Sequence, residues 1–138
     1  MRASIDLIEE LTFIKQKKAS IIQQEQELSK PILTDYSQVG RIYDWFKNLP
    51  EDLLLTRQDS VHKRQFLFII ILLFSPSFLV GDKLKRGLRN ELTKVFGFRS
   101  PSAVSNLGAD VLCWYKSYQG FREKTNKIYQ KLLVELQS

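Results

Sequence analysis

One unbroken apolar run, FLFIIILLF at residues 66–74, constrains the fold more than any other feature of the sequence. Such a run leaves no polar face, so the segment has to be buried on all sides. A membrane-spanning helix needs about 20 apolar residues, and Ser75-Pro76 interrupts this run well before that length. An interfacial segment is the alternative. We expect a core helix over residues 60–74, the most buried segment of the chain, and no membrane partner.

The rest of the chain carries helical rather than strand signals. No Asn-Gly or Asp-Gly hairpin turn occurs, and period-2 alternation is almost absent. Apolar residues instead recur at spacings of three and four, which predicts an all-α fold. The further helices are expected over residues 5–28, 36–49, 83–96, 101–118 and 121–136, with Gly120 separating the last two.

The first predicted helix carries a partial heptad seam. Leu11 fills one intermediate position of the seam, but Lys18 and Glu25 occupy the next two. The helix can lie on its own domain, or it can form a homodimer with a second copy, in which the two opposite charges would pair across antiparallel chains. The seam residues, seven apart, are Leu7, Ile14, Ile21 and Leu28.

Positive charge is concentrated in the C-terminal part of the chain. Residues 83–138 hold 11 Lys/Arg against 4 Asp/Glu, whereas residues 1–82 hold 10 against 11. Such a field attracts a polyanion, nucleic acid first and anionic lipid second. A solvated basic face is the plainer interpretation of the same excess.

The two helices at 83–96 and 101–118 are joined by a short turn, GFRSP. Gly97 is predicted to end the first helix in a left-handed conformation, after which Phe98 can turn inward. Ser100 is a suitable N-cap, and Pro101 suits the first helical position.

Residues 91–112, ELTKVFGFRSPSAVSNLGADVL, resemble helix-turn-helix DNA-binding proteins. Gly97 matches the turn glycine of that family, and Phe98 the apolar residue after it. Arg99-Ser100-Pro101 stands where two residues are usual, which would alter the presentation of the second helix. The positions that match the buried residues of the two helices are Leu92, Val95, Val104 and Leu107.

The resemblance implies a set of DNA contacts. Ser102, Ser105 and Asn106, with Ala109, fall on the face that contacts bases, and asparagine can bind adenine through two hydrogen bonds. Basic residues of the first helix and the turn, among them Lys85 and Arg86, would contact phosphates, and the helix start after Ser100 could hold a phosphate oxygen. The candidate DNA-binding residues are Arg89, Lys94, Arg99, Ser100, Ser102, Ser105 and Asn106.

Signatures of enzymes, cofactors and metal sites are missing from the sequence. It has no P-loop, no Gly-x-Gly-x-x-Gly and no Cys/His cluster, and His62 is its only histidine. Cys113 lies between Leu112 and Trp114, which predicts a buried thiol and a reducing compartment. Acidic residues near the N-terminus argue against a signal peptide, so we expect a cytoplasmic, non-enzymatic protein.

Two functions remain open at this stage. The first is binding of double-stranded DNA by a small transcriptional regulator or accessory factor of a bacterium, phage or mobile element. The second is an α-helical protein-protein interaction or assembly role without nucleic acid. We expect residues 1–59 to form a helical arm, with a possible oligomerisation role, and residues 60–138 to form the helix-turn-helix-like domain.

Overall fold

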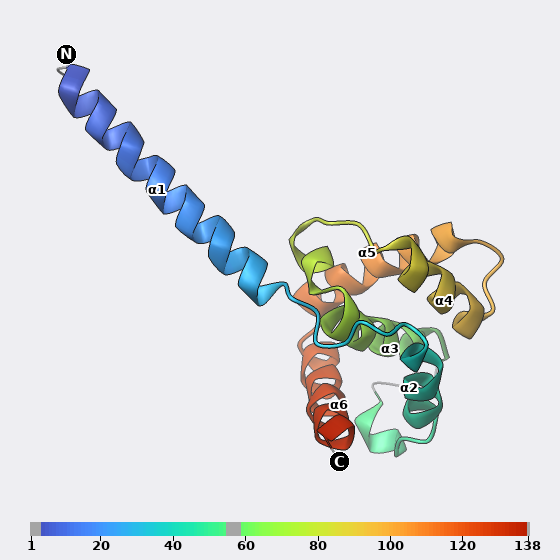
Figure 1. Ribbon diagram of the computed structural model, residues 1–138. Coiled ribbons are helices and arrows are strands. Elements are labelled where there is room, and N and C mark those ends of the chain that lie inside the picture. The colour runs from blue at the N-terminus through green and yellow to red at the C-terminus, as the bar shows by residue number, and fades with distance from the viewer. Residues whose placement is uncertain (1–3, 55–58, 138) are drawn as a thin grey trace. The chain divides into compact units, whose positions relative to one another are not determined.

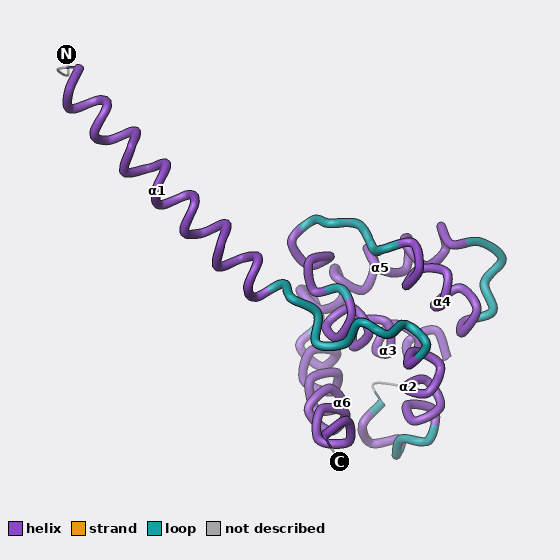
Figure 2. Tube along the Cα trace, viewed as in Figure 1, coloured by secondary structure: helices purple, strands orange, loops and turns teal. Residues whose placement is uncertain are grey.

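A computed structural model describes residues 4–54 and 59–137, and over these residues the chain is all helical, as predicted (Figure 1). Figure 2 shows helices and connecting loops, and no strand, in this part of the chain. The two short 3₁₀ segments are Glu51–Leu53 and Pro76–Val80. The α-helices are α1 (Ser4–Leu28), α2 (Gln38–Lys47), α3 (Asp59–Phe74), α4 (Arg86–Phe96), α5 (Pro101–Ser117) and α6 (Gln119–Gln137).

The chain divides into two compact units, residues 1–30 and residues 31–138. The first unit contains α1, whose side chains from Ile5 to Leu28 are all exposed. The second contains α2 to α6 around one hydrophobic core. Helix α2, which the sequence analysis grouped with the N-terminal arm, contributes Val39, Ile42 and Phe46 to that core.

Helix α3 is the centre of the second unit. It packs against α2, α5 and α6, which surround it in Figure 1. Eight of the nine residues from Phe66 to Phe74 are buried, Leu72 being half-buried, which agrees with the expected core helix. Among the described helices, none combines the length and the apolarity that crossing a bilayer requires.

Aromatic side chains fill the space between α3 and its neighbours. Phe68 stacks on Tyr115 of α5, with ring centroids 4.3 Å apart and planes inclined by 9°. Phe66 meets Tyr43 of α2 at 4.8 Å and Phe96 of α4 at 5.7 Å. Offset and edge-on ring contacts of this kind add to the stabilisation from burial alone. They fix α2, α4 and α5 against one central helix.

The segment before α2 is attached to the end of α3. The N–H groups of Ile32 and Leu33 both donate to the carbonyl of Leu73, at 2.9 and 3.0 Å. Carbonyls in the last turn of a helix have no partner within it, so this segment satisfies one of the carbonyls left open where α3 ends at Phe74.

Two helix boundaries differ from the prediction. Helix α4 begins at Arg86 rather than Lys83, because Lys85 has an extended backbone and Leu84 packs in the core outside any helix. The break before α6 falls at Tyr118, whose backbone is extended, and Gly120 lies inside the first turn of α6. At the start of α6, the extended backbone of Tyr118 and not Gly120 thus sets the helix boundary.

Candidate nucleic-acid interface

The connection from α4 to α5 is a tight turn built on Gly97. Its φ of 71° and ψ of 28° lie in the left-handed region, as predicted. The N–H of Phe98 donates to the Thr93 carbonyl at 3.0 Å, and the N–H of Gly97 donates to that of Lys94 at 3.2 Å. The first of these is the bond that closes a Schellman-type helix end. The glycine therefore sets the direction in which the chain leaves α4.

Apolar side chains fill the inside of this turn. Leu92 and Val104 are fully buried, whereas Phe98 and Leu107 are half-buried. The Phe98 ring packs on Phe96 with centroids 5.2 Å apart, and the Lys63 ammonium lies over the Phe98 ring, 5.5 Å from its centroid. The expected inward turn of Phe98 is present, although burial is partial.

The inner face of α5 contains a close contact that sequence reasoning missed. Gly108 is buried, and a Cβ atom added to it would lie 3.0 Å from Cζ of Phe78 and 3.9 Å from Cδ1 of Leu84. The Phe78 ring therefore lies close to the helix backbone, and a larger residue at position 108 would require the ring to shift by a few tenths of an ångström. This contact fixes which side of α5 faces inward and leaves the opposite side for solvent.

The outward side of α5 carries small polar side chains. Ser102, Asn106 and Ala109 are exposed, and Ser105 is half-buried. Cys113 is also exposed, so the prediction of a buried thiol is wrong. It follows Ala109 by one helical turn and thus continues the exposed stripe instead of joining the core.

The start of α5 differs from the expected cap. Ser100 stands at the N-cap position with an extended backbone, and Pro101 occupies the first helical position. The Ser100 hydroxyl, however, hydrogen-bonds the Ser102 hydroxyl at 2.8 Å and makes no capping bond to a backbone amide. The positive end of the helix is thus left without a side-chain acceptor, a condition in which an anion is bound favourably.

The three candidate cations of this region are not equally accessible. Lys94 and Arg99 are exposed. Arg89 is half-buried, and its Nε atom is buried without a hydrogen-bond partner. Lys94 and Arg99 can therefore reach a phosphate directly, whereas part of the Arg89 guanidinium is enclosed by the protein.

A partly buried ion pair lies beside the stripe. Arg64 of α3 contacts Oδ2 of Asp110 through Nη2 at 2.6 Å and through Nε at 2.7 Å, and its guanidinium stacks on Trp114 at 4.7 Å. Asp110 follows Asn106 by one helical turn, so its charge would otherwise face any polyanion on α5. The pair neutralises that carboxylate. Since the two residues are far apart in sequence, no local pattern indicated the contact.

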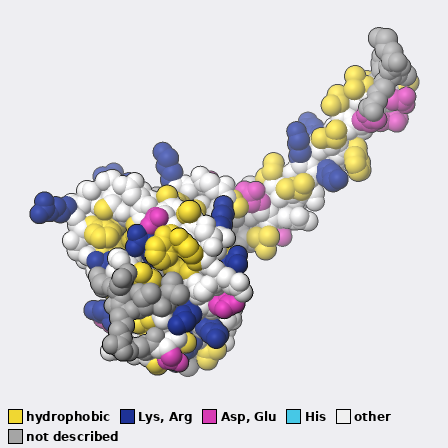
Figure 3. Space-filling model, turned by 180° about the vertical axis from the view of Figure 1, so that it is seen from behind, with side chains coloured by type: hydrophobic (Ala, Val, Ile, Leu, Met, Phe, Trp, Pro, Cys, Tyr) yellow, Lys and Arg dark blue, Asp and Glu magenta, His cyan; other side chains and the backbone are white. Residues whose placement is uncertain are grey.

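The surface view shows Lys and Arg side chains distributed over the visible face of the molecule instead of collected in one patch (Figure 3). Within the described residues, no group of His, Cys, Asp and Glu side chains is arranged to hold a metal ion. Comparison of the chain with protein-family models, curated proteins and solved structures found no match. Its function therefore has to be inferred from the geometry of the surface itself.

Proposed function

We propose that this chain is a non-enzymatic protein that binds double-stranded DNA through α5, as a small transcriptional regulator or accessory factor does. The observation that carries the proposal is the exposed face of α5, where Ser102 and Asn106 lie one turn apart after an uncapped helix start. Helix-turn-helix proteins insert the N-terminal part of their second helix into the major groove, where such short side chains can reach base edges.

The surroundings of this face favour a polyanion. Lys94 and Arg99 lie on the two sides of the turn that precedes α5, and both are exposed. The one carboxylate of α5 itself, Asp110, is already paired with Arg64 at 2.6 Å. A phosphate backbone on α5 would therefore meet cations and a positive helix end, with the carboxylate of that helix neutralised.

These positions suggest different roles for the residues in DNA binding. Asn106 can donate to and accept from the edge of adenine, so it would supply sequence preference. Lys94 and Arg99 would supply affinity that is independent of sequence. Arg89, which the sequence also assigned to phosphate contact, would contribute less because part of its guanidinium is buried.

Electrophoretic mobility of a random duplex at two salt concentrations tests the proposal. Binding should be seen at low salt and should weaken steeply as salt rises, with a slope of about 0.9 in log K against log salt for each phosphate contacted. The combined Lys94→Ala and Arg99→Ala variant should bind more weakly and show a shallower slope. Lys131→Ala, an exposed lysine on α6, is the matched control and should behave like the parent protein.

A protein-protein interaction role is the second candidate, and a specific observation favours it. A groove of about 390 Å³ lies between α2 and α6, with Ile42, Trp45 and Leu132 on its floor and Arg41 and Glu135 at its edges. Apolar floors with charged rims are typical of surfaces that bind helices or peptides. If no duplex binds at low salt, this interpretation replaces the DNA-binding one.

A further inference from the structure

Helix α1 exposes a row of large apolar side chains that its own unit does not cover. Among them, Leu7 is 48% exposed, Leu11 57% and Ile14 46%. An isolated helix in water gains little from its backbone hydrogen bonds alone, and most helices in proteins are stabilised by packing of an apolar face. We therefore expect this apolar row to pack against another surface, and the charges beside it indicate which one.

The charges of α1 fall into three blocks. Asp6, Glu9 and Glu10 form an acidic block near the N-terminal end, and three lysines at 15, 17 and 18 form a basic block in the middle. Glu25 and Glu27 form a second acidic block. Figure 3 shows the acidic side chains near the N-terminal end of α1 and the basic ones along its middle.

Full overlap of two copies is unfavourable in either direction. In a parallel pair in register, Lys18 faces Lys18 and Glu25 faces Glu25 at the core positions of the heptad. In an antiparallel pair aligned end to end, the basic blocks face each other at the centre, since the acidic blocks flank them on both sides. Like charges held directly opposite each other destabilise the pair.

We propose that α1 forms an antiparallel pair with α1 of a second copy, staggered so that the N-terminal acidic block of each helix lies against the basic block of the other. In this register Leu11 packs opposite Ile14 of the other copy, and Leu7 lies opposite the aliphatic stem of Lys18. Glu10 then lies across from Lys17 on the flank of the seam, twice by symmetry. The pairing is independent of whether α5 binds DNA.

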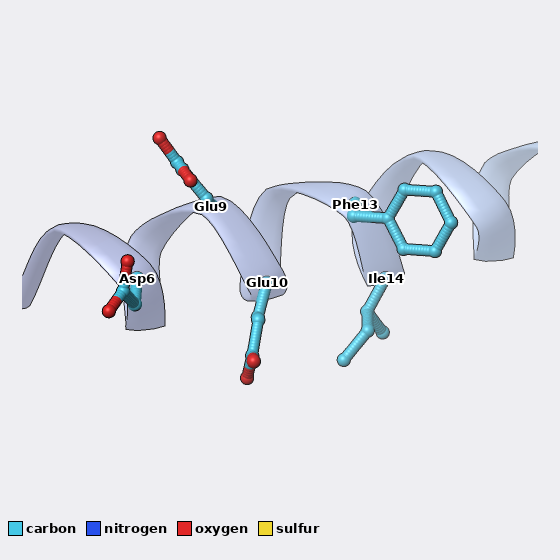
Figure 4. Close-up of a pocket in the computed structure, with 5 residues that line it drawn as sticks. All are labelled: Asp6, Glu9, Glu10, Phe13 and Ile14. Atoms are coloured by element: carbon cyan, nitrogen blue, oxygen red, sulfur yellow. The ribbon is translucent and has the colours of Figure 1, made fainter. Parts of the chain in front are cut away.

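The shape of α1 near the acidic block supports this partner. A shallow hollow there is lined by Asp6, Glu9, Glu10, Phe13 and Ile14 (Figure 4). Glu10 and Ile14 project to one side of the helix in this view, and Glu9 projects to the other. A lysine has the two properties that such a hollow accepts, an apolar stem and a cationic end. Within one helix, the Lys17 ammonium already lies 6.0 Å from the centre of the Phe13 ring, on the edge where the pairing needs it.

The stagger also defines what lies outside the pair. The overlap covers residues 4–21, so Ile22 and Leu28 are not enclosed. A second stagger, with Leu11 opposite Leu28, would bring the basic block to about one helical turn from Glu25 and Glu27. It offers two acidic residues where the proposed stagger offers three. Leu28 therefore distinguishes the two registers.

Sedimentation equilibrium of the full chain without DNA tests the pairing. The parent protein should dimerise at tens of micromolar, and Leu11→Glu should abolish the dimer while Leu28→Glu leaves it unchanged. Glu10→Lys should weaken the dimer roughly 2- to 30-fold, since two flank pairs are lost. Glu27→Lys, the same change outside the overlap, should have no effect, and Glu10→Lys combined with Lys17→Glu should restore the parent value.

Disulfide trapping in a Cys113→Ser background tests direction and register. A mixture of the Leu7→Cys and Lys18→Cys proteins should cross-link to each other, and neither should cross-link when it is alone. Cross-linking of each single variant with itself would show a parallel pair and overturn the proposal. A parent protein that stays monomeric, or a dimer that Leu28→Glu disrupts, would overturn it as well, whatever the outcome of the DNA-binding assays.

Discussion

Replacement of Gly97 by alanine should destabilise the protein through backbone conformation alone. Apart from Gly97 and its two chain neighbours, no residue has an atom within 4 Å of the position that a Cβ would occupy at Gly97, so the substitution meets no obstacle from the rest of the fold. Its φ of 71° is the only source of strain. A non-glycine residue in the left-handed region costs about 1–2 kcal/mol, and the lower entropy of the unfolded alanine chain offsets about half of that. We expect a net loss of about 1 kcal/mol.

Gly40 of α2 provides the matched control. Its Cβ position is equally open, but it lies inside a helix with no positive φ. Gly40→Ala should therefore stabilise the protein by about 0.5–1 kcal/mol, from helix propensity. At roughly 3–5 °C per kcal/mol for a chain of this size, the midpoints of the two variants should differ by about 5–10 °C.

Thermal unfolding followed by circular dichroism measures both variants against the parent. Gly97→Asn should recover much of the loss, because asparagine tolerates the left-handed region better than alanine does. If Gly97→Ala and Gly40→Ala shift the midpoint equally, or if Gly97→Ala is as stable as the parent, the turn is not held by the glycine and the reasoning fails.

Four further predictions concern DNA binding and assembly. Asn106→Ala should cost about 1–3 kcal/mol on a selected duplex and little on random DNA, measured by fluorescence anisotropy; equal losses on both would exclude base recognition. Lys94→Ala and Arg99→Ala should each weaken binding alike on every duplex and flatten the salt dependence by about 0.9, and a sequence-dependent loss would contradict this. Arg89→Ala should lower the unfolding midpoint more than it lowers DNA affinity; the reverse would mean that the guanidinium is accessible. Leu11→Glu should give a folded monomer that binds a two-site duplex more weakly than the parent protein does, but binds a single-site duplex equally well. If the variant and the parent protein shift the two-site duplex equally in a mobility assay, pairing of α1 does not contribute to DNA binding.

Local patterns in the sequence were sufficient to predict the central helix and the turn after α4. The run from Phe66 to Phe74 has no polar face, so burial on all sides was expected, and the structure agrees. Gly97 follows an amphipathic helix and stands three residues before Ser100-Pro101, a combination that favours a helix end at the glycine. These features depend on neighbours within a few residues, which the sequence displays directly.

Contacts between distant residues were not predictable from such patterns. The Phe78 ring on Gly108 and the pairing of Arg64 with Asp110 join residues from different elements, and neither has a local signal. The exposure of Cys113, by contrast, could have been predicted from the sequence. Cys113 stands one turn after Ala109 on the solvent-facing stripe of α5, and its apolar neighbours Leu112 and Trp114 lie on the adjoining faces.

The most direct test of the central claim is a nuclear magnetic resonance titration of the labelled protein with a short random duplex at low salt. If α5 enters the DNA groove, the backbone amides of Arg99, Ser102 and Asn106 should shift first and most, and the amides of α6 around the exposed Lys131 should stay in place. Raising the salt should reverse the shifts, because phosphate contacts dominate non-specific binding. Shifts confined to α6, or none at a tenfold excess of duplex, would contradict a DNA-binding role for α5.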